Sequence, residues 1–382
     1  MPAERNKQAI VEKNDINLSN ANMSSHTPAG QMMTFASEIT KDYALKYLVG
    51  VRHGRAHRDG DIHIHDLDYY PTKTTTCIQY DLGDIYERGF STKNGSVRTP
   101  QSIQSYATLA TIVFQTNQNE QHGGQAIPAF DFFMAKGVAK SFRKHLASFI
   151  NFYVAMENGT QADEKAIRTL IKEHLPSIKS TEAERETLRI ALIALQIIID
   201  KEHLTRIAEK AYQQTKKDTH QAMEGFIHNL NTMHSRGGNQ VVFSSINYGT
   251  DTSAEGRLVI EELLKATIEG LGTRGEVPVF PIQIFKVKDG VSYSEKDFEK
   301  AMKAENIEDA MRGTYEAPNF DLLLRACQTT SKALFPNFMF LDTPFNKNEK
   351  WKADDPKRYI YELATMGCRT RVFENVAGEK SS

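Results

Sequence analysis

Apolar residues recur with a helical period after a polar N-terminal segment. Residues 1–28 are rich in Asn, Ser and Lys and lack such a period, so we expect a flexible arm there. A helix is predicted over 28–48, because Thr27 suits its cap and Pro28 suits its first turn. Its apolar side chains are spaced by four residues and predict one buried stripe, formed by Phe35, Ile39, Tyr43 and Tyr47.

Two later stretches carry the same helical period. Thr99 and Pro100 are typical of a helix start, and this helix is expected to run to about residue 115. Its buried side is predicted to consist of Ile103, Ala107, Ala110 and Phe114. Pro128 precedes another helical segment, which is expected to run to about residue 156.

Over residues 160–235 the apolar residues keep a helical spacing throughout, so we assign this segment to a helical scaffold. Thr181 and Glu184 form a capping box, which marks the start of a helix. One long helix is expected to follow, with an inward stripe formed by Leu188, Leu192, Leu195 and Ile199.

A period of two appears at residues 60–66, between the first helix and the second. Its alternation predicts a strand with His63 and His65 on one face and two isoleucines on the other. The β-branched run at 74–77 is suited to return toward the same place.

The last part of the chain alternates strand and helix patterns. The expected strands are 241–248, 279–287 and 338–341, and the helices between them are 253–271 and 318–334. Proline cannot donate to a ladder, so Pro278 and Pro281 favour a start of the second strand at Ile282. Strands separated by helices predict an α/β fold with a parallel, barrel-like core wrapped in helices.

Composition narrows the classes of partner. The 382-residue chain has a formal net charge of −1, which provides no basic field for a nucleic-acid backbone, so no nucleic-acid partner is expected. The longest apolar run, 190–199, is far shorter than the about 20 residues that span a bilayer, so no membrane partner is expected. Three cysteines without close spacing, and no signal peptide, indicate a reducing cytoplasm.

A cysteine near the C-terminus is the first candidate for chemistry. Gly367 precedes Cys368 and Arg369 follows it, so the backbone is free to turn sharply and to hold the sulfur at the tip of a loop. Cys327 lies on a predicted helix face with two leucines nearby, and we assign it to packing instead.

Several chemistries stay open on these residues. His63 and His65, followed by an aspartate, form a metal-ligand pattern found in barrel hydrolases. A Cys–His pair would perform acyl transfer. Two cysteines that meet in a barrel would instead carry hydrogen atoms or electrons. The polar turn with Gly123 and Gly124 is either an ordinary connector or a place where backbone N–H groups approach a ligand.

A set of short motifs is more specific together than any one of them. The motifs are TPAGQM at 27–32, KDYALKY at 41–47, HRDGDIHIHDLDYYP at 57–71, TTTC at 74–77, QHGGQ at 121–125, CQTT at 327–330 and MGCRT at 366–370. On these motifs the chain resembles the anaerobic (class III) ribonucleoside-triphosphate reductases of the glycyl radical enzyme family.

The resemblance implies a ten-stranded α/β barrel, of which a catalytic domain over 29–382 forms a part. It implies a finger loop over 364–372 that carries Cys368 into the centre as a thiyl radical, which abstracts the 3′ hydrogen of the ribose. Cys77 then returns a hydrogen atom after the 2′ hydroxyl leaves as water. Met366 matches the subgroup that takes its reducing equivalents from formate.

The resemblance also implies where other ligands bind. His63 and His65 are expected to form hydrogen bonds near the site rather than to hold a metal. The substrate, a ribonucleoside triphosphate, is expected at His122, Gly123, Gly124 and Gln125. Deoxynucleotide or ATP effectors are expected at the interface of a homodimer, and the matching positions are Arg98, Gln101 and Lys144.

Relatives of this kind carry parts that we do not find in this sequence. These are an ATP-cone domain, the second half of the barrel, a cysteine-rich zinc site and the glycine that stores the radical. A radical-SAM activating enzyme is the expected partner that generates this radical. We therefore expect the chain to be incomplete and inactive alone.

Alternatives remain beside this interpretation. A pyruvate formate-lyase relative would carry adjacent cysteines at the loop tip, whereas Cys368 is flanked by Gly367 and Arg369. A metal-dependent hydrolase would use His63 and His65. A non-catalytic fragment would still dimerise and bind dNTP effectors.

Overall fold

A five-stranded parallel sheet forms the centre of the computed structural model, which describes residues 27–75, 77–92, 95–159, 162–233, 241–367 and 375–378. The strands are β1 (Cys77–Gln79), β4 (Gly124–Ile127), β5 (Ser244–Tyr248), β6 (Ile282–Val287) and β7 (Asn337–Phe340). They lie side by side in chain order, and every neighbouring pair is parallel. The predicted α/β class with a parallel core is confirmed, and the described strands supply five of the ten that the resemblance implies.

Helices make the crossovers that a parallel sheet requires. They are α2 (Pro28–Tyr43), α3 (Val51–Asp59), α4 (Leu82–Arg88), α5 (Ile103–Asn117), α6 (Phe130–Asn158), α7 (Glu164–His174), α8 (Glu182–Ile193), α9 (Lys201–Thr232), α10 (Ala254–Glu269), α11 (Glu295–Ala301), α12 (Ile307–Met311) and α13 (Phe320–Ala333). Short helical turns add η3 (Ala44–Leu48), η4 (Tyr70–Thr72) and η5 (Arg358–Tyr361). Among the described helices, none is long and apolar enough to cross a membrane.

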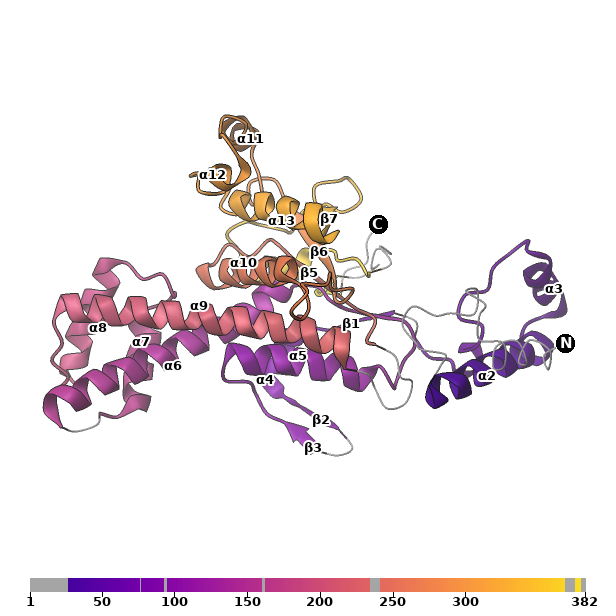
Figure 1. The fold of residues 1–382 in the computed structure, drawn as a ribbon, viewed down its shortest axis with the longest axis horizontal. Helices are drawn as coiled ribbons and strands as arrows, with labels where there is room; N and C mark the ends of the chain where they lie inside the picture. The colour runs from indigo at the N-terminus through magenta and orange to yellow at the C-terminus, as the bar shows by residue number, and fades with distance from the viewer. Residues whose placement is uncertain are drawn as a thin grey trace.

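The long helices α5, α6, α9 and α10 pack on one another beside the sheet (Figure 1). Their contact faces belong to one continuous apolar core that also takes in side chains of β5 and β6. The predicted buried side of α5 is confirmed, since Ile103, Ala107, Ala110 and Phe114 are all buried. This helix starts later than predicted, because the side chain of Ser102 caps it.

The scaffold segment contains three helices, α7, α8 and α9, as its pattern predicted. The capping box of Thr181 and Glu184 is confirmed at the start of α8. The single long helix is wrong, because α8 ends at Ile193 and the backbone of Gln196 adopts a left-handed φ of 59°. Ile199 is still buried, but from the connection to α9.

The first helix was predicted correctly, but its buried stripe was not. The hydroxyl of Thr27 caps α2 by accepting from the backbone N–H of Gly30 at 3.1 Å. The four predicted stripe residues are exposed, with Tyr47 reaching 72%. The reason is tertiary: α2 and α3 lie to one side of the sheet and its helices, so no described element covers that face (Figure 1).

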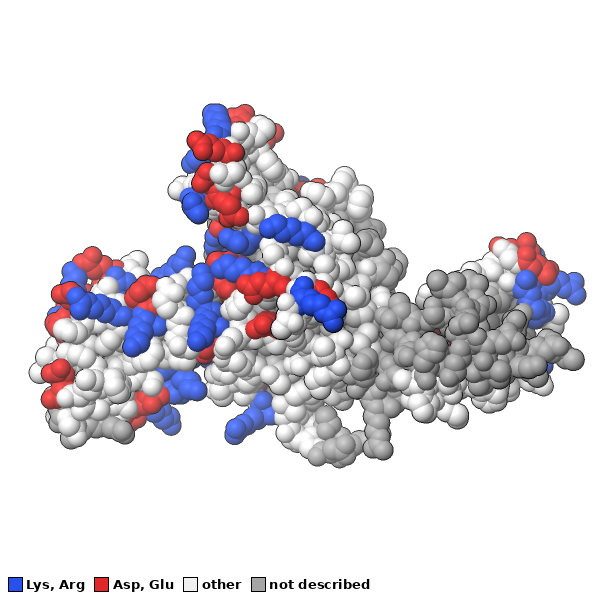
Figure 2. Space-filling model, in the orientation of Figure 1, with Lys and Arg blue, Asp and Glu red and all other residues white. Residues whose placement is uncertain are grey.

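Charged residues of both signs alternate over the helical surface, as Figure 2 shows for one face. No large field of one sign is visible on that face.

A two-stranded antiparallel hairpin, β2 (Phe90–Thr92) and β3 (Gly95–Val97), projects below α4 and α5 in the same orientation (Figure 1).

Candidate active site

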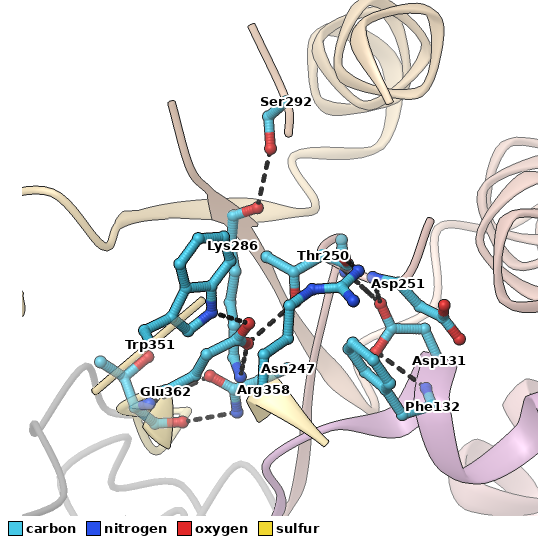
Figure 3. Close-up of polar contacts among 12 residues, drawn as sticks. Asp131, Phe132, Asn247, Thr250, Asp251, Lys286, Ser292, Trp351, Arg358 and Glu362 are labelled. Carbon is cyan, nitrogen blue, oxygen red and sulfur yellow. Dashed lines mark hydrogen bonds and ion pairs between the residues drawn. The ribbon is translucent and has the colours of Figure 1, made fainter. Parts of the chain in front are cut away.

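The segment after η5 crosses the sheet from the carboxyl ends of its strands toward their amino ends. At the carboxyl ends, Glu362 forms a fully buried ion pair with Lys286 of β6, with 2.9 Å between Oε2 and Nζ (Figure 3). The same carboxylate accepts from the hydroxyl of Thr250 at 2.8 Å and from the indole Nε1 of Trp351 at 3.0 Å. Every oxygen of this buried carboxylate therefore has a donor.

Burial alone raises the pKa of Glu362, because it penalises the charged form. The charge of Lys286 and the hydrogen bonds from Lys286, Trp351 and Thr250 outweigh that effect, so the pKa lies below its ordinary value. Glu362 is thus ionised at neutral pH and fixes the start of the segment.

Three residues further on, the segment is held by a strand side chain. Asn247 of β5 donates from Nδ2 to the carbonyl of Thr365 at 3.0 Å and accepts at Oδ1 from the N–H of Thr365 at 3.0 Å. The next residue, Met366, is buried, and its Cε lies 3.2 Å from the place where a β-carbon on Gly124 would be. Gly124 is the first residue of β4.

Gly367 follows against the first residue of β6. A β-carbon on Gly367 would meet Cδ1 of Ile282 at 2.7 Å, so a side chain there would require the Ile282 side chain to shift. Its backbone φ is not in the left-handed region, which means that close packing rather than a sharp turn requires this glycine. Cys368 and residues 369–372 of the expected finger loop lie outside the described residues.

Cys77 is the first residue of the edge strand β1 and is exposed. Its register partner in β4 is Gly124, the residue that Met366 contacts. The structure therefore brings the base of the expected finger loop to the strand next to Cys77. The two stretches are 289 positions apart in the sequence, between residues 77 and 366.

Residues 60–66 do not form the predicted strand. Gly60 ends α3 with a φ of 86°, and the following N–H groups of Asp61 and Ile62 bond back to the carbonyl of Ala56. None of the described strands pairs with residues 60–66, and the end of α3 takes the hydrogen bonds of Asp61 and Ile62 instead. His63 and His65 are both exposed, with their ring centroids 6.1 Å apart.

A polar cluster joins this loop to the glycine turn before β4. Asp66 lies between two imidazoles, with Oδ2 2.7 Å from Nδ1 of His65 and Oδ1 3.1 Å from Nε2 of His122. Tyr69 stacks on the His122 ring with 3.7 Å between centroids. The N–H of His122 donates to the hydroxyl of Thr74 at 3.3 Å, just before β1. Thr74 and Asp66 thus both contact His122, and the predicted return of 74–77 toward His63 and His65 stays a prediction.

Gln125 is buried in β4, and its side chain is used within the protein. The amide oxygen accepts from the hydroxyl of Tyr80 at 2.6 Å, and the amide nitrogen donates to the carbonyl of Phe114 at 3.0 Å. Gly123 has a φ of 101°, a conformation that favours glycine. A substrate contact at residues 122–125 stays a prediction.

A second buried acid cluster lies at the carboxyl end of β5. One oxygen of Asp131 accepts from the N–H groups of Gly249, Thr250 and Asp251 at 2.8, 3.1 and 3.0 Å. Burial, and next the charge of Asp131, raise the pKa of Asp251 to about 7. Arg358 from η5 donates to the carbonyl of Thr250 at 2.7 Å (Figure 3). This cluster ties the loop after β5 to the segment that leads to Glu362.

A cavity of about 150 Å³ lies at the same carboxyl edge. It is lined by Lys288, Trp351, Tyr361 and Glu362, among others. Lys288 follows the last residue of β6, whereas Cys77 is the first residue of β1. In a parallel sheet these are opposite ends, so this cavity is not the place where the predicted thiols would meet.

The metal-hydrolase alternative is not favoured. In the part of the chain that the structure describes, no three His, Cys, Asp or Glu side chains are grouped to hold a metal ion.

Cys327, predicted to be packed, is exposed on α13, so that assignment is wrong. The helix turns the neighbouring leucines inward and leaves position 327 at the edge of its buried face.

The expected effector residues lie on the surface around the start of α5. Arg98, Gln101 and Lys144 are all exposed. Lys140 of α6 donates from Nζ to the carbonyl of Pro100 at 2.9 Å, which brings that face of α6 against residues 98–101. Lys144 is one helical turn beyond Lys140 on the same face.

A family model described as anaerobic ribonucleoside-triphosphate reductase matches residues 19–382. The chain belongs to this family. The anaerobic ribonucleoside-triphosphate reductase of Escherichia coli (strain K12) is 24% identical over 378 residues, which are 98% of this chain and 42% of that protein. The reductase of Enterobacteria phage T4 is 26% identical over 374 residues, which are 97% of this chain and 48% of that protein.

The chain thus spans less than half the length of these curated reductases. Among solved structures, the anaerobic ribonucleotide reductase from Thermotoga maritima in complex with dATP and CTP is similar over 90% of this chain and 47% of that chain. The sequence identity there is 12% and the TM-score is 0.46.

The sequence motifs of this reductase family did not point to the residues that hold the segment before Cys368. Lys286 carried one available signal, since it is a charged residue inside a mostly apolar strand, IQIFKV. Asn247 stands beside two serines in SSINY and is a weaker signal of the same kind. Such a residue needs a buried partner, but a single sequence does not identify that partner. Glu362 and Thr365 supply it from more than 70 positions away.

Proposed function

We propose that this chain carries the two thiols of an anaerobic ribonucleoside-triphosphate reductase, with Cys368 and Cys77 acting on opposite faces of the ribose. The observation that supports this most directly is the contact between Met366 and Gly124, the register partner of Cys77. Cys368 is two residues beyond Met366. Two residues of extended chain span about 7 Å, so this short sequence separation supports a place for Cys368 close to Cys77.

Both thiols have distinct roles in this proposal. The Cys368 thiyl takes the 3′ hydrogen of the ribose, the 2′ hydroxyl leaves as water with a proton, and Cys77 gives a hydrogen atom to the 2′ carbon. The 3′ hydrogen then returns from Cys368. Formate closes the balance: ribonucleotide, formate and one proton give deoxyribonucleotide, carbon dioxide and water. A glycyl radical, when present, supplies the unpaired electron to the thiol.

The residues around Met366 fit this chemistry. Met366 is buried, Gly124 and Gly367 bring the backbones close together, and Phe243 lies within 3.3 Å of a β-carbon position on Gly124. This apolar packing excludes water from the base of the loop, as a radical intermediate requires. Because Met366 matches the formate-dependent subgroup, we assign the reducing equivalents to formate.

The polar cluster of Asp66, His122 and Tyr69 is the proposed substrate contact. It lies just before Cys77 in β1 and just before Gly124 in β4. Asp66 orients the His122 ring, and Tyr69 covers one of its faces. His63 and His65 are proposed to form hydrogen bonds here and not to hold a metal.

Effector binding is proposed at Arg98, Gln101 and Lys144, in a homodimer, with a dNTP or ATP as ligand. Burial, and next the positive charges of Lys136 and Arg143, lower the pKa of Lys140 beside them. An anionic triphosphate would relieve this repulsion among cations. Titration of the wild-type protein and Lys144→Ala with each dNTP tests the site, and equal affinities for the two proteins would remove it.

Replacement of each cysteine in the protein that contains this chain tests the function. Cys77→Ser and Cys368→Ser are expected to lower dNTP formation at least a thousandfold in the presence of formate and an activating enzyme. Cys327→Ser is the matched control, since Cys327 is exposed on α13, and it is expected to keep activity within twofold. Activity that survives Cys77→Ser would contradict the proposal. The expected inactivity of this chain alone stays a prediction.

A further inference from the structure

Asn247 is an unusual residue for its position. It lies in the central strand β5, which is buried along its whole length, and its own side chain has no exposed surface. A buried amide is costly unless its groups are hydrogen-bonded. Both groups of Asn247 bond to one residue, the N–H and the C=O of Thr365. The side chain thereby makes the pair of bonds that a neighbouring strand would make.

The two residues after Thr365 are each fixed by a different strand. Met366 fills the space beside Gly124 in β4, and Gly367 lies against Ile282 in β6. Three consecutive residues of the segment therefore contact three adjacent strands. A slip of the segment by one residue would place a side chain at the Gly367 position, where a β-carbon lies 2.7 Å from Cδ1 of Ile282 and forces that side chain to move.

We propose that Asn247 is a positioning residue that sets the register of the segment before Cys368 against the sheet. This inference rests on the proposed function, because it concerns the depth at which Cys368 enters. A one-residue slip moves an extended chain by about 3.4 Å. Hydrogen transfer needs reacting atoms about 3–3.5 Å apart, so such a slip would put the thiol out of reach.

The contact is specific because it acts on the backbone of one residue. Apolar packing alone tolerates sliding, since it has no direction, whereas two hydrogen bonds to the same residue do not. Glu362 holds the segment three residues earlier, nearer the carboxyl ends of the strands. Asn247 adds a pair of hydrogen bonds at Thr365, closer to the loop tip.

Hydrogen exchange of the Thr365 amide tests this role without any assay of activity. Asn247→Ala removes both bonds, and Asn247→Leu removes them while it keeps the branched shape of the side chain. Both variants are expected to speed exchange at Thr365 about tenfold, and to leave exchange in α9 and α10 unchanged. Ser245→Ala is the matched control, because it removes a buried hydrogen bond from the same strand to the Gln125 carbonyl.

Unchanged exchange at Thr365 in the Asn247 variants would overturn the proposal, and so would an equal increase in Ser245→Ala. If neither Asn247 variant folds, Gly367→Ala gives the same readout from the partner side, and it must speed exchange at Thr365. In the reductase that contains this chain, Asn247→Leu is expected to lower kcat at least tenfold with an unchanged KM and unchanged glycyl radical content. A positive exchange result without dNTP formation by the wild-type protein would overturn the proposed function and leave the register role standing.

Discussion

The side chain of Met366 lies beside Gly124, in contact with the place that a β-carbon there would take. This contact joins the last described residues before Cys368 to the strand beside Cys77. It depends on the absence of a side chain at Gly124, where Met366 and Phe243 approach a β-carbon position to 3.2 and 3.3 Å. The Gly-Gly turn of the sequence therefore has a packing role as well as a conformational one.

Gly124→Ala and Met366→Ala are expected to couple. The added methyl group in Gly124→Ala is expected to lower the free energy of unfolding by about 1–3 kcal/mol through overpacking. Loss of the buried Met366 side chain is expected to cost about 2–5 kcal/mol. The double variant should cost less than the sum, because the methyl group enters the vacated space. Urea unfolding of the four proteins measures the coupling, and strict additivity would show that the two residues do not touch.

Gly367→Ala is expected to destabilise the protein because its methyl group meets Ile282 at 2.7 Å. The expected loss in free energy of unfolding is about 1–3 kcal/mol. Ile282→Ala in the same chain should recover part of this loss, since it removes the clashing atom. Gly225→Ala in α9 is the matched control, because nothing lies within 4 Å of its β-carbon position. That control should be neutral or slightly stabilising in thermal unfolding, as expected for alanine in a helix.

Glu362 and Lys286 are expected to depend on each other. Glu362→Gln leaves the Lys286 ammonium buried without a counter-charge, so the free energy of unfolding should fall by about 3–5 kcal/mol. The double variant Glu362→Gln/Lys286→Met should regain much of the lost free energy of unfolding, because neither of these two positions then carries a buried charge. Denaturant unfolding decides the point: a double variant as unstable as Glu362→Gln would mean that the ion pair is not the reason for the loss.

Asp251 is expected to make stability fall as pH rises. Burial and the charge of Asp131 raise its pKa from 3.8 to about 7 in the folded protein, so the folded state holds this proton more tightly than the unfolded chain. The resulting stabilisation is complete below about pH 4 and is lost as the pH rises through 7, with an upper bound of about 4 kcal/mol.

Asp251→Asn cannot titrate, so its free energy of unfolding should increase relative to the wild-type protein between pH 5 and pH 8. Arg358 also faces this carboxyl group and lowers its pKa, which reduces the size of the effect. Asp354→Asn, at an exposed position, serves as the control and should leave the pH profile unchanged. Parallel profiles for the wild-type protein and Asp251→Asn would show that Asp251 is already ionised at pH 5.

The sequence by itself determined the class of fold and the place of several of its helices and strands. Ile282 was predicted as the start of β6 from two prolines, and the structure begins the strand there. The capping box at Thr181 and Glu184 was readable because capping is a local hydrogen-bond pattern. Motifs at 57–71, 121–125 and 366–370 led to the family, which the match over residues 19–382 shows.

Only the tertiary structure decided which element packs against, or pairs with, each predicted segment. The stripe from Phe35 to Tyr47 has the right period for burial, yet burial needs a partner element, and none of the described elements covers it. The alternation at 60–66 needs a neighbouring strand, and the end of α3 took its hydrogen bonds instead. Asn247 and Thr365, 118 positions apart, are joined by contacts that no local pattern encodes. The hydrophobic period can be recognised in a single segment, whereas burial also depends on the second segment that packs against it.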